Sequence, residues 1–431
     1  MVKIQITSRG IKKTLRKFDY LQAIAEYIWN GFDAKATVVA FKVDWNALGG
    51  IERIIISDNG YGIDRKVLER KFTPFYESEK QIDPANRVRM SSAMHGKNGI
   101  GRLTFHSFCS QAVWTTTYKE DGLENRTYSI HIASESLDTY NVSDVPAAHD
   151  RTGTTVTFDH IHEDIDLAEL RQFLSREFGW FLELHSGRKF TVLMEDGKPL
   201  DYSGIIGDRE MRELEHPGTK TRFAVKFIRW RERINHEYSR LYFLDSRMKE
   251  KYKQPTSFNN KGDSFYHSVY IQSRLFDDFD FMSEEQYGQQ EMAFGLSRKN
   301  EAFQYLLEEV NQLISGKRKP FLKSYSDMVL TDLAAADAFP FFGDTPEGRG
   351  RREELEYLIQ ELYRIEPRIF ARLNPEQKKV LVHLLDLSMQ TADRKRLFEV
   401  LSGVIRPEGP ERQELAGLLE SGEAALSAGL D

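Results

Sequence analysis

Residues 15–36 read LRKFDYLQAIAEYIWNGFDAKA. The apolar residues of this stretch recur at helical spacing, which predicts one helix from Leu15 to Ala36. At about 100° per residue, Glu26, Asn30 and Asp33 share one face of this helix. The residues on the opposite side are apolar: Leu21, Ile24, Ile28 and Phe32. The polar face is either the solvated side of an ordinary amphipathic helix or one wall of a site.

A second polar element follows the predicted strand Ile51–Ser57, where the chain reads Asp58-Asn59-Gly60-Tyr61-Gly62. Two glycines beside an acid let the backbone approach a ligand closely. The carboxylate can accept a hydrogen bond from an exocyclic amine such as that of adenine. A plain hairpin turn is the alternative interpretation.

The third element is Gly96-Lys97-Asn98-Gly99-Ile100-Gly101, which precedes a predicted helix starting at Leu103–Phe108. Backbone amides without side chains at a helix N-terminus form an anion site. The sequence is not a Walker loop, because no Gly-Lys-Ser/Thr closes it. Taken alone, it also fits a flexible turn. The long polar stretch before it, Thr73–His95, is predicted to be a loop.

The fourth element, Gly153-Thr154-Thr155, starts a predicted strand, where threonine is common for structural reasons alone. The four elements in this order resemble the GHKL superfamily of ATPases. Its members include gyrase B-type topoisomerases, heat-shock chaperone ATPases, histidine kinases, mismatch-repair ATPases and Microrchidia proteins. The matching positions are Glu26-x-x-x-Asn30-x-x-Asp33-Ala34, Asp58-x-Gly60-x-Gly62, Gly96–Gly101 and Gly153-Thr154.

The resemblance implies an ATP site with assigned roles. Glu26 would be the general base that activates water, and Asn30 would hold the Mg²⁺ that bridges the phosphates. Asp58 would bind the adenine amine, with support from Thr154 directly or through a water. Asp33 would lie near the pocket, either against the ribose or behind the residues that contact the nucleotide. The remaining positions would offer backbone to the nucleotide: Gly60, Gly62, Lys97, Asn98, Gly99, Ile100 and Gly101. Residues Thr73–His95 would be a lid over ATP.

The resemblance also implies the domain organisation and the α/β (α+β) fold class. Residues 1–205 would form a two-layer Bergerat ATP-binding sandwich, and residues 206–318 a transducer-like α/β domain. The resemblance does not extend to residues 319–431, where leucines at helical spacing predict a helical region that either packs as an ordinary domain or offers a surface for a protein partner. Within Gly295–Asn300, Arg298 matches the arginine with which the chaperone ATPases contact the γ-phosphate, with Lys299 as second choice. A solvent-exposed arginine at a helix start is the alternative.

The function implied is Mg²⁺-dependent ATP hydrolysis that drives a homodimeric clamp or switch, in the manner of genome-maintenance or defence ATPases. One alternative is an ATP-gated scaffold with little turnover. The other is a kinase of the histidine-kinase type, against which the intact Glu26 argues, as does the absence of a histidine-bearing helix before the motifs.

The amino-acid composition bears on possible partners and on the cellular compartment. Lys and Arg total 60 against 66 Asp and Glu, a formal net charge of −6, so bulk charge gives no support for nucleic-acid binding. The single cysteine, Cys109, excludes an intramolecular disulfide and favours a reducing compartment. The sequence has no membrane-span pattern and no signal-peptide pattern at its N-terminus. We therefore expect a cytoplasmic protein that does not enter a membrane.

Overall fold

The structure is a computed structural model. It describes residues 7–72, 101–120, 124–145, 150–188, 190–235, 237–259, 262–281, 298, 300–371 and 373–390. The chain divides into two compact units, one of residues 1–255 with 266–302 and the other of residues 256–265 with 303–431. The predicted boundaries at 205 and 318 stay a prediction. The predicted mixed α/β class is confirmed, since both sheets and helices are present.

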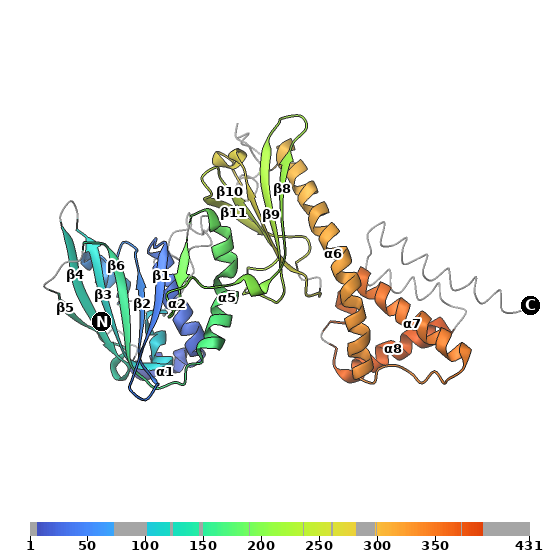
Figure 1. Ribbon diagram of the computed structural model, residues 1–431, viewed down its shortest axis with the longest axis horizontal. Helices are drawn as coiled ribbons and strands as arrows, with labels where there is room; N and C mark the ends of the chain where they lie inside the picture. The colour runs from blue at the N-terminus through green and yellow to red at the C-terminus, as the bar shows by residue number, and fades with distance from the viewer. Residues whose placement is uncertain are drawn as a thin grey trace, which may run out of the picture. The chain divides into compact units, whose positions relative to one another are not determined.

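The first unit contains a seven-stranded sheet with the order β5-β4-β3-β6-β2-β1-β7 (Figure 1). All neighbouring pairs are antiparallel except β1 with β7. The strands are β1 (Val38–Trp45), β2 (Ile51–Asp58), β3 (Cys109–Lys119), β4 (Asn125–Ala133), β5 (Asn141–Asp144), β6 (Gly153–Ile161) and β7 (Thr191–Leu193). Because β2 and β6 are adjacent central strands, the two sequence motifs at their ends are brought together.

Helix α2 (Tyr20–Asp33) carries the first motif and is shorter than expected. The predicted single helix Leu15–Ala36 was wrong at its start, because Leu15 ends a separate helix, α1 (Ser8–Leu15). The Asp19 side chain accepts a hydrogen bond from the Gln22 backbone N–H at 2.8 Å. This N-cap satisfies a backbone donor that would otherwise have no partner, so the helix starts after Asp19.

The apolar side of α2 packs as the spacing predicted: Ile24, Ile28 and Phe32 are buried. Trp29 lies against α5 (Leu167–Leu184), with ring centroids 4.4 Å from Phe178 and 5.1 Å from Phe181. Figure 1 shows α2 and α5 beside the strands β1 and β2. The two helices and the sheet therefore share one core, which fixes α2 against the end of β2.

A second sheet in the same unit has the order β11-β10-β12-β9-β8, with β10 and β12 parallel. Its strands are β8 (Ile206–Glu215), β9 (Arg222–Trp230), β10 (Arg240–Leu244), β11 (Glu250–Pro255) and β12 (Tyr266–Gln272). The stretch Tyr202–Thr219 is polar and shows no apolar strand pattern. It contains β8 because an edge strand pairs through its backbone, and this one has no fully buried side chain to produce an apolar pattern.

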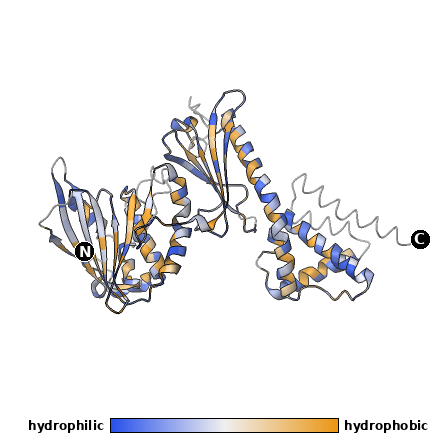
Figure 2. Cartoon of the chain, in the orientation of Figure 1, coloured by the Kyte–Doolittle hydropathy of each residue, from blue (hydrophilic) through white to orange (hydrophobic). Residues whose placement is uncertain are grey.

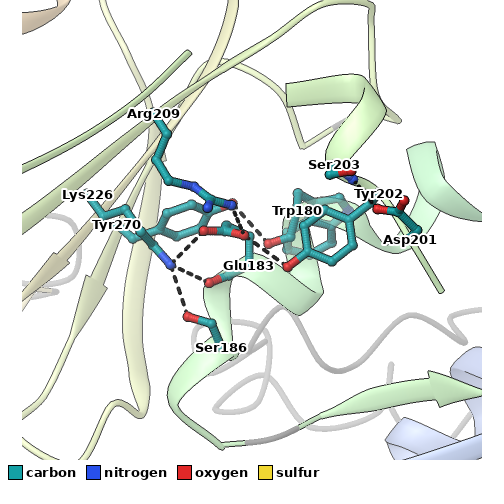
Figure 3. Close-up of polar contacts among 9 residues, drawn as sticks. All are labelled: Trp180, Glu183, Ser186, Asp201, Tyr202, Ser203, Arg209, Lys226 and Tyr270. Atoms are coloured by element: carbon teal, nitrogen blue, oxygen red, sulfur yellow. Dashed lines mark hydrogen bonds and ion pairs between the residues drawn. The ribbon is translucent and has the colours of Figure 1, made fainter. Parts of the chain in front are cut away.

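Helix α5 joins the two sheets through its C-terminal turn. The Trp180 ring stacks on Tyr242 with centroids 5.8 Å apart, and the Tyr270 hydroxyl donates to the Trp180 carbonyl at 2.9 Å. The Glu183 carboxylate, only 5% exposed, faces Lys226 and Arg209 of the second sheet (Figure 3). Both nitrogen–oxygen distances are 3.1 Å.

The Glu183 site is a buried, charged contact with several partners. The Tyr202 hydroxyl donates to Glu183 Oε2 at 2.9 Å, and Lys226 Nζ also donates to the Glu183 carbonyl at 2.7 Å. Burial lowers the pKa of Lys226, and the nearby carboxylate opposes that shift. The charged form of Lys226 therefore depends on Glu183.

We expect Glu183→Ala to destabilise the first unit by about 3 kcal/mol or more, because it leaves Lys226 buried and uncompensated. The control is Lys220→Ala, which breaks an exposed pair with Glu215 at 3.6 Å, and should cost less than about 1 kcal/mol. Denaturant unfolding of the full chain measures both. Equal shifts of the two midpoints would show that the Glu183 contact contributes no more than a surface pair.

In the part that the structure describes, the second unit is mainly helical from residue 303 on, and its segment 256–265 is irregular. Its helices are α6 (Glu301–Ala335), α7 (Pro346–Ile365) and α8 (Pro375–Met389), and Figure 2 shows hydrophilic and hydrophobic residues interspersed along them. The glycine-containing segment Gly343–Gly350 overlaps the start of α7, where the Thr345 side chain caps the helix and proline occupies its first position. Among the described residues, no helix is long and apolar enough to cross a membrane.

Candidate active site

Asp58 is the last residue of β2, where it pairs in register with Thr154 of β6. Its carboxylate accepts a hydrogen bond from the Gly60 backbone N–H at 2.7 Å. Burial raises the pKa of Asp58 to about 6, and the backbone N–H groups of Gly60 and Thr154 oppose the shift. The structure thus brings together three predicted site residues around one carboxylate whose proton affinity is unusually high.

The turn after Asp58 is held by hydroxyl groups of the neighbouring strands. Thr154 Oγ1 lies 3.1 Å from Thr116 Oγ1, and Thr116 Oγ1 accepts from the Ile63 backbone N–H at 2.9 Å. Gly62 has a φ of +74°, and a Cβ there would lie 2.1 Å from the Thr117 carbonyl oxygen. No other residue fits this backbone without a shift, so Gly62 fixes how closely the turn approaches β3.

Two residues that shape this site were not assigned roles from the sequence. Asn59 Oδ1 accepts from the backbone N–H groups of Thr37 and Val38 at 2.9 and 3.0 Å, which ties the end of β2 to the start of β1. A Cβ on Gly31 would lie 3.1 Å from the Asp58 Cβ and 2.8 Å from Val39 Cγ2. The only sequence signal was a glycine inside a helical pattern, which often marks close packing.

The polar face of α2 lies where the sequence predicted. Glu26 and Asp33 are partly buried, and Asn30 is exposed. A Cβ on Gly101 would lie 2.7 Å from Glu26 Oε2, so the end of the glycine motif lies directly on the carboxylate of the first motif. Burial and the Asp33 and Asp58 carboxylates raise the pKa of Tyr61, which places these two acids near one phenol.

The segment after Gly101 differs from the expected helix start. It is a 3-10 helix, η3 (Gly101–Ser107), in place of the α-helix predicted from Leu103. Thr104 Oγ1 donates to the Gly101 carbonyl at 2.7 Å, and Ser107 Oγ donates to the Thr104 carbonyl at 2.9 Å. These side-chain bonds three residues back compete with α-helical hydrogen bonds.

Arg298, which was predicted to contact the γ-phosphate, lies against the second sheet. Arg298 Nη2 donates to the Tyr252 hydroxyl at 2.6 Å, and its guanidinium lies 5.0 Å from the centre of that ring, on the second sheet. Its contact with a phosphate stays a prediction. Lys97, Asn98, Gly99, Ile100, Lys299 and the predicted lid Thr73–His95 lie outside the described residues.

The comparison with protein families accounts for the arrangement. Residues 19–162 match the family model described as histidine kinase-, DNA gyrase B-, and HSP90-like ATPase. Residues 19–162 are an ATPase domain of this family. The matched segment starts at the N-cap of α2 and ends just after β6, so it contains the described motif residues from Glu26 to Thr154. The comparison with curated proteins gives no match.

The described residues of the ATPase domain fit a bound nucleotide. Asp58 supplies a carboxylate acceptor for an amine, and a Cβ at Gly60 would lie 2.6 Å from the Ala34 carbonyl, so the turn has no room for a larger side chain. Asn30 is exposed, and its amide oxygen is a hard ligand of the kind that Mg²⁺ accepts. The donor and acceptor set is therefore suited to ATP with Mg²⁺.

The raised pKa of Asp58 predicts that nucleotide affinity and fold stability both depend on pH. A carboxylate accepts from the adenine amine, but a protonated carboxyl loses much of this capacity, so nucleotide affinity should fall as pH falls through about 6. Fold stability should respond in the opposite direction. Because the folded pKa is raised, the folded state binds the proton more tightly than the unfolded chain, and Asp58 favours folding more as pH falls from about 6 towards 4.

Titrating a fluorescent ATP analogue between pH 7.5 and 5.5, with the thermal midpoint measured in parallel, checks this prediction. Asp58→Asn is the matched variant, because an amide does not titrate and its affinity should vary less over the same range. An affinity that does not change with pH in the wild type would contradict the assigned role of Asp58.

Proposed function

We propose that the chain hydrolyses ATP with Mg²⁺ and uses the nucleotide cycle to switch a homodimer between two conformations. The observation that carries the proposal is the contact of the Glu26 carboxylate with Gly101. It puts a candidate general base on the glycine motif, on the same helix whose Gly31 packs against Asp58. An ATP-binding module that only sensed nucleotide would have no use for a base there.

In this proposal some residues bind the nucleotide and one transfers a proton. Asp58 accepts from the adenine amine and so fixes one end of the substrate. Glu26 orients a water and takes its proton as the water attacks the γ-phosphorus. The bond from the γ-phosphorus to the bridging oxygen breaks, so that ADP leaves with that oxygen and inorganic phosphate is formed. Asn30 would hold Mg²⁺, which when bound would neutralise charge at the phosphates. The amides of residues 97–101 would supply hydrogen bonds to the phosphate oxygens.

The packing of α5 supports a conformational output. This helix contacts α2 through Trp29 and the second sheet through Trp180 and Glu183. A change at α2 on nucleotide binding can therefore reach the second sheet through one continuous helix. The helical region that follows offers a surface for a protein partner. The proposal also includes a role in genome maintenance or defence and a cytoplasmic location.

A nucleotide-gated scaffold is the second candidate, favoured by the many contacts that join α5 to the second sheet. Phosphate release from ATP and Mg²⁺ by the purified full chain separates the two. Turnover supports the proposal, and tight ATP binding without phosphate release supports the scaffold.

Light scattering with a non-hydrolysable ATP analogue tests the clamp, which predicts a dimer with the analogue and a larger monomer fraction without nucleotide.

A histidine-kinase-type activity would label protein with radioactive γ-phosphate from ATP. The proposal predicts release of that phosphate to water with no labelled protein.

A further inference from the structure

Arg102 follows the glycine motif and makes a contact that the ATPase assignment does not explain. Its Nη2 donates to the Phe72 backbone carbonyl at 2.7 Å, and its guanidinium lies 5.6 Å from the centre of the Phe72 ring. Burial lowers the pKa of Arg102 to about 10. A long cationic side chain is thus held inside the domain and bound to main chain, instead of extending into solvent.

The backbone at Arg102 is held from a second side. The Tyr27 hydroxyl donates to the Arg102 carbonyl at 2.7 Å. Tyr27 is only 3% exposed, and its ring lies 4.7 Å from Phe158 and 6.2 Å from Trp114, measured between centroids. These contacts with the sheet leave the phenol little freedom, so the hydroxyl is a fixed anchor for the chain at Arg102.

Phe72, whose backbone carbonyl accepts the hydrogen bond from Arg102, also packs against the sheet. Its ring meets Trp114 edge-on at 5.8 Å and Tyr140 at 5.9 Å. Trp114 therefore supports both anchors, Tyr27 and Phe72. The chain immediately after Gly101 is held between α2 and the end of α3 (Leu68–Phe72), with β3 behind both.

The contact between Tyr27 and Arg102 lies next to the candidate general base, because each of the two residues follows a residue of the Glu26–Gly101 contact in the chain. Tyr27 follows Glu26 in α2, and Arg102 follows Gly101, against which the Glu26 carboxylate lies. A shift of the chain at Arg102 would carry Gly101 with it and change the surface on which the carboxylate rests.

We propose that Arg102 and Tyr27 are positioning residues for ATP hydrolysis, which hold Gly101 against Glu26 and so direct the general base at the water. The inference rests on the proposed role of Glu26. Neither residue needs to touch the nucleotide. The loss of either should therefore appear mainly in kcat, because the binding of adenine at Asp58 is left intact.

The test compares four variants of the full chain for kcat, KM, ATP affinity and thermal midpoint. Arg102→Ala removes the bond to Phe72 and should lower kcat by about 10- to 100-fold with KM changed by less than about threefold. Arg102→Lys keeps one donor that can reach the carbonyl and should recover most of the loss. Tyr27→Phe removes only the hydroxyl and should lower kcat by about fivefold or more.

Tyr20→Phe is the matched control. Tyr20 also lies on α2 and also donates through its hydroxyl, at 2.7 Å, but to Glu169 of α5. It should leave kcat unchanged. Arg102→Ala and Tyr27→Phe with wild-type kcat would overturn the inference, as would losses in kcat that the lysine variant does not recover.

The result also distinguishes this inference from the proposed function. If Glu26→Gln is inactive but the Arg102 and Tyr27 variants are normal, only the positioning role fails. If Glu26→Gln hydrolyses ATP like the wild type, the proposed base is wrong and the positioning role falls with it.

Discussion

Glu26→Gln is expected to reduce the rate of ATP hydrolysis by about 10²- to 10⁴-fold, the contribution typical of a general base. The amide has nearly the same shape, so it can still lie against Gly101, but it cannot take a proton from water. ATP affinity should change by less than about threefold, because the base acts on the water and the loss falls on kcat. Phosphate release and equilibrium binding of ATP, measured on the same preparation, check both parts.

Gln22→Ala is the matched control for this prediction. Gln22 lies one turn earlier on α2 and is exposed, so its truncation should leave turnover near the wild-type value. If Glu26→Gln retains wild-type turnover, Glu26 is not the base. If it loses ATP binding in proportion to turnover, Glu26 acts in binding and not in proton transfer.

Asp58→Ala is expected to weaken ATP binding by about 10- to 150-fold, since a hydrogen bond to a charged group contributes about 1.5–3 kcal/mol. The carboxylate is partly buried beside Gly60 and Thr154, so water cannot easily replace it as the acceptor for the adenine amine. Discrimination against nucleotides without that amine, such as ITP, should fall as well. Competition of ATP and ITP against a fluorescent analogue measures both effects.

Asp44→Ala controls for the loss of an acid from the same sheet away from the site, because Asp44 pairs with Arg53 at the opposite end of β2 from Asp58. Asp44 lies on β1, next to β2, and its side chain is 51% exposed in a long contact of 3.9 Å with Arg53. Its removal should not change ATP affinity. Because Asp58→Ala also leaves the Gly60 N–H without its acceptor, a thermal midpoint is needed for each variant. Equal affinity of wild type and Asp58→Ala, with both folded, would contradict adenine recognition by Asp58.

The fold was predictable where periodicity and burial agree. The apolar side of α2 and the whole of α5, Leu167–Leu184, follow from apolar residues at helical spacing. The β-branched run before Asp58 predicts β2, a central strand of the first sheet. Elements whose stability comes from backbone pairing or capping were harder to predict. Strand β8 is a polar edge strand, and the break before α2 depends on the Asp19 cap.

In the candidate site, too, features set by local spacing were predictable and features set by contacts between distant segments were not. Spacing along α2 indicated that Glu26, Asn30 and Asp33 share a face, and the acid followed by two glycines indicated a close approach at Asp58. The roles of Gly31 and Asn59 could not be assigned, because each depends on a contact with another segment. Arg102 and Tyr27 were missed for the same reason, since 75 residues separate the two partners of their hydrogen bond.

The amino-acid sequence alone was enough to predict the candidate site: a carboxylate, an amide and a second carboxylate at fixed spacing, with glycines that would let the backbone approach a nucleotide. Local spacing fixes these features because helix and strand geometry are the same in every protein. Only the tertiary structure decided that Glu26 lies on Gly101, that Asp58 pairs with Thr154, and that Glu183 joins α5 to the second sheet. Those contacts depend on how distant segments fill a common core, and packing of that kind is a property of the whole fold.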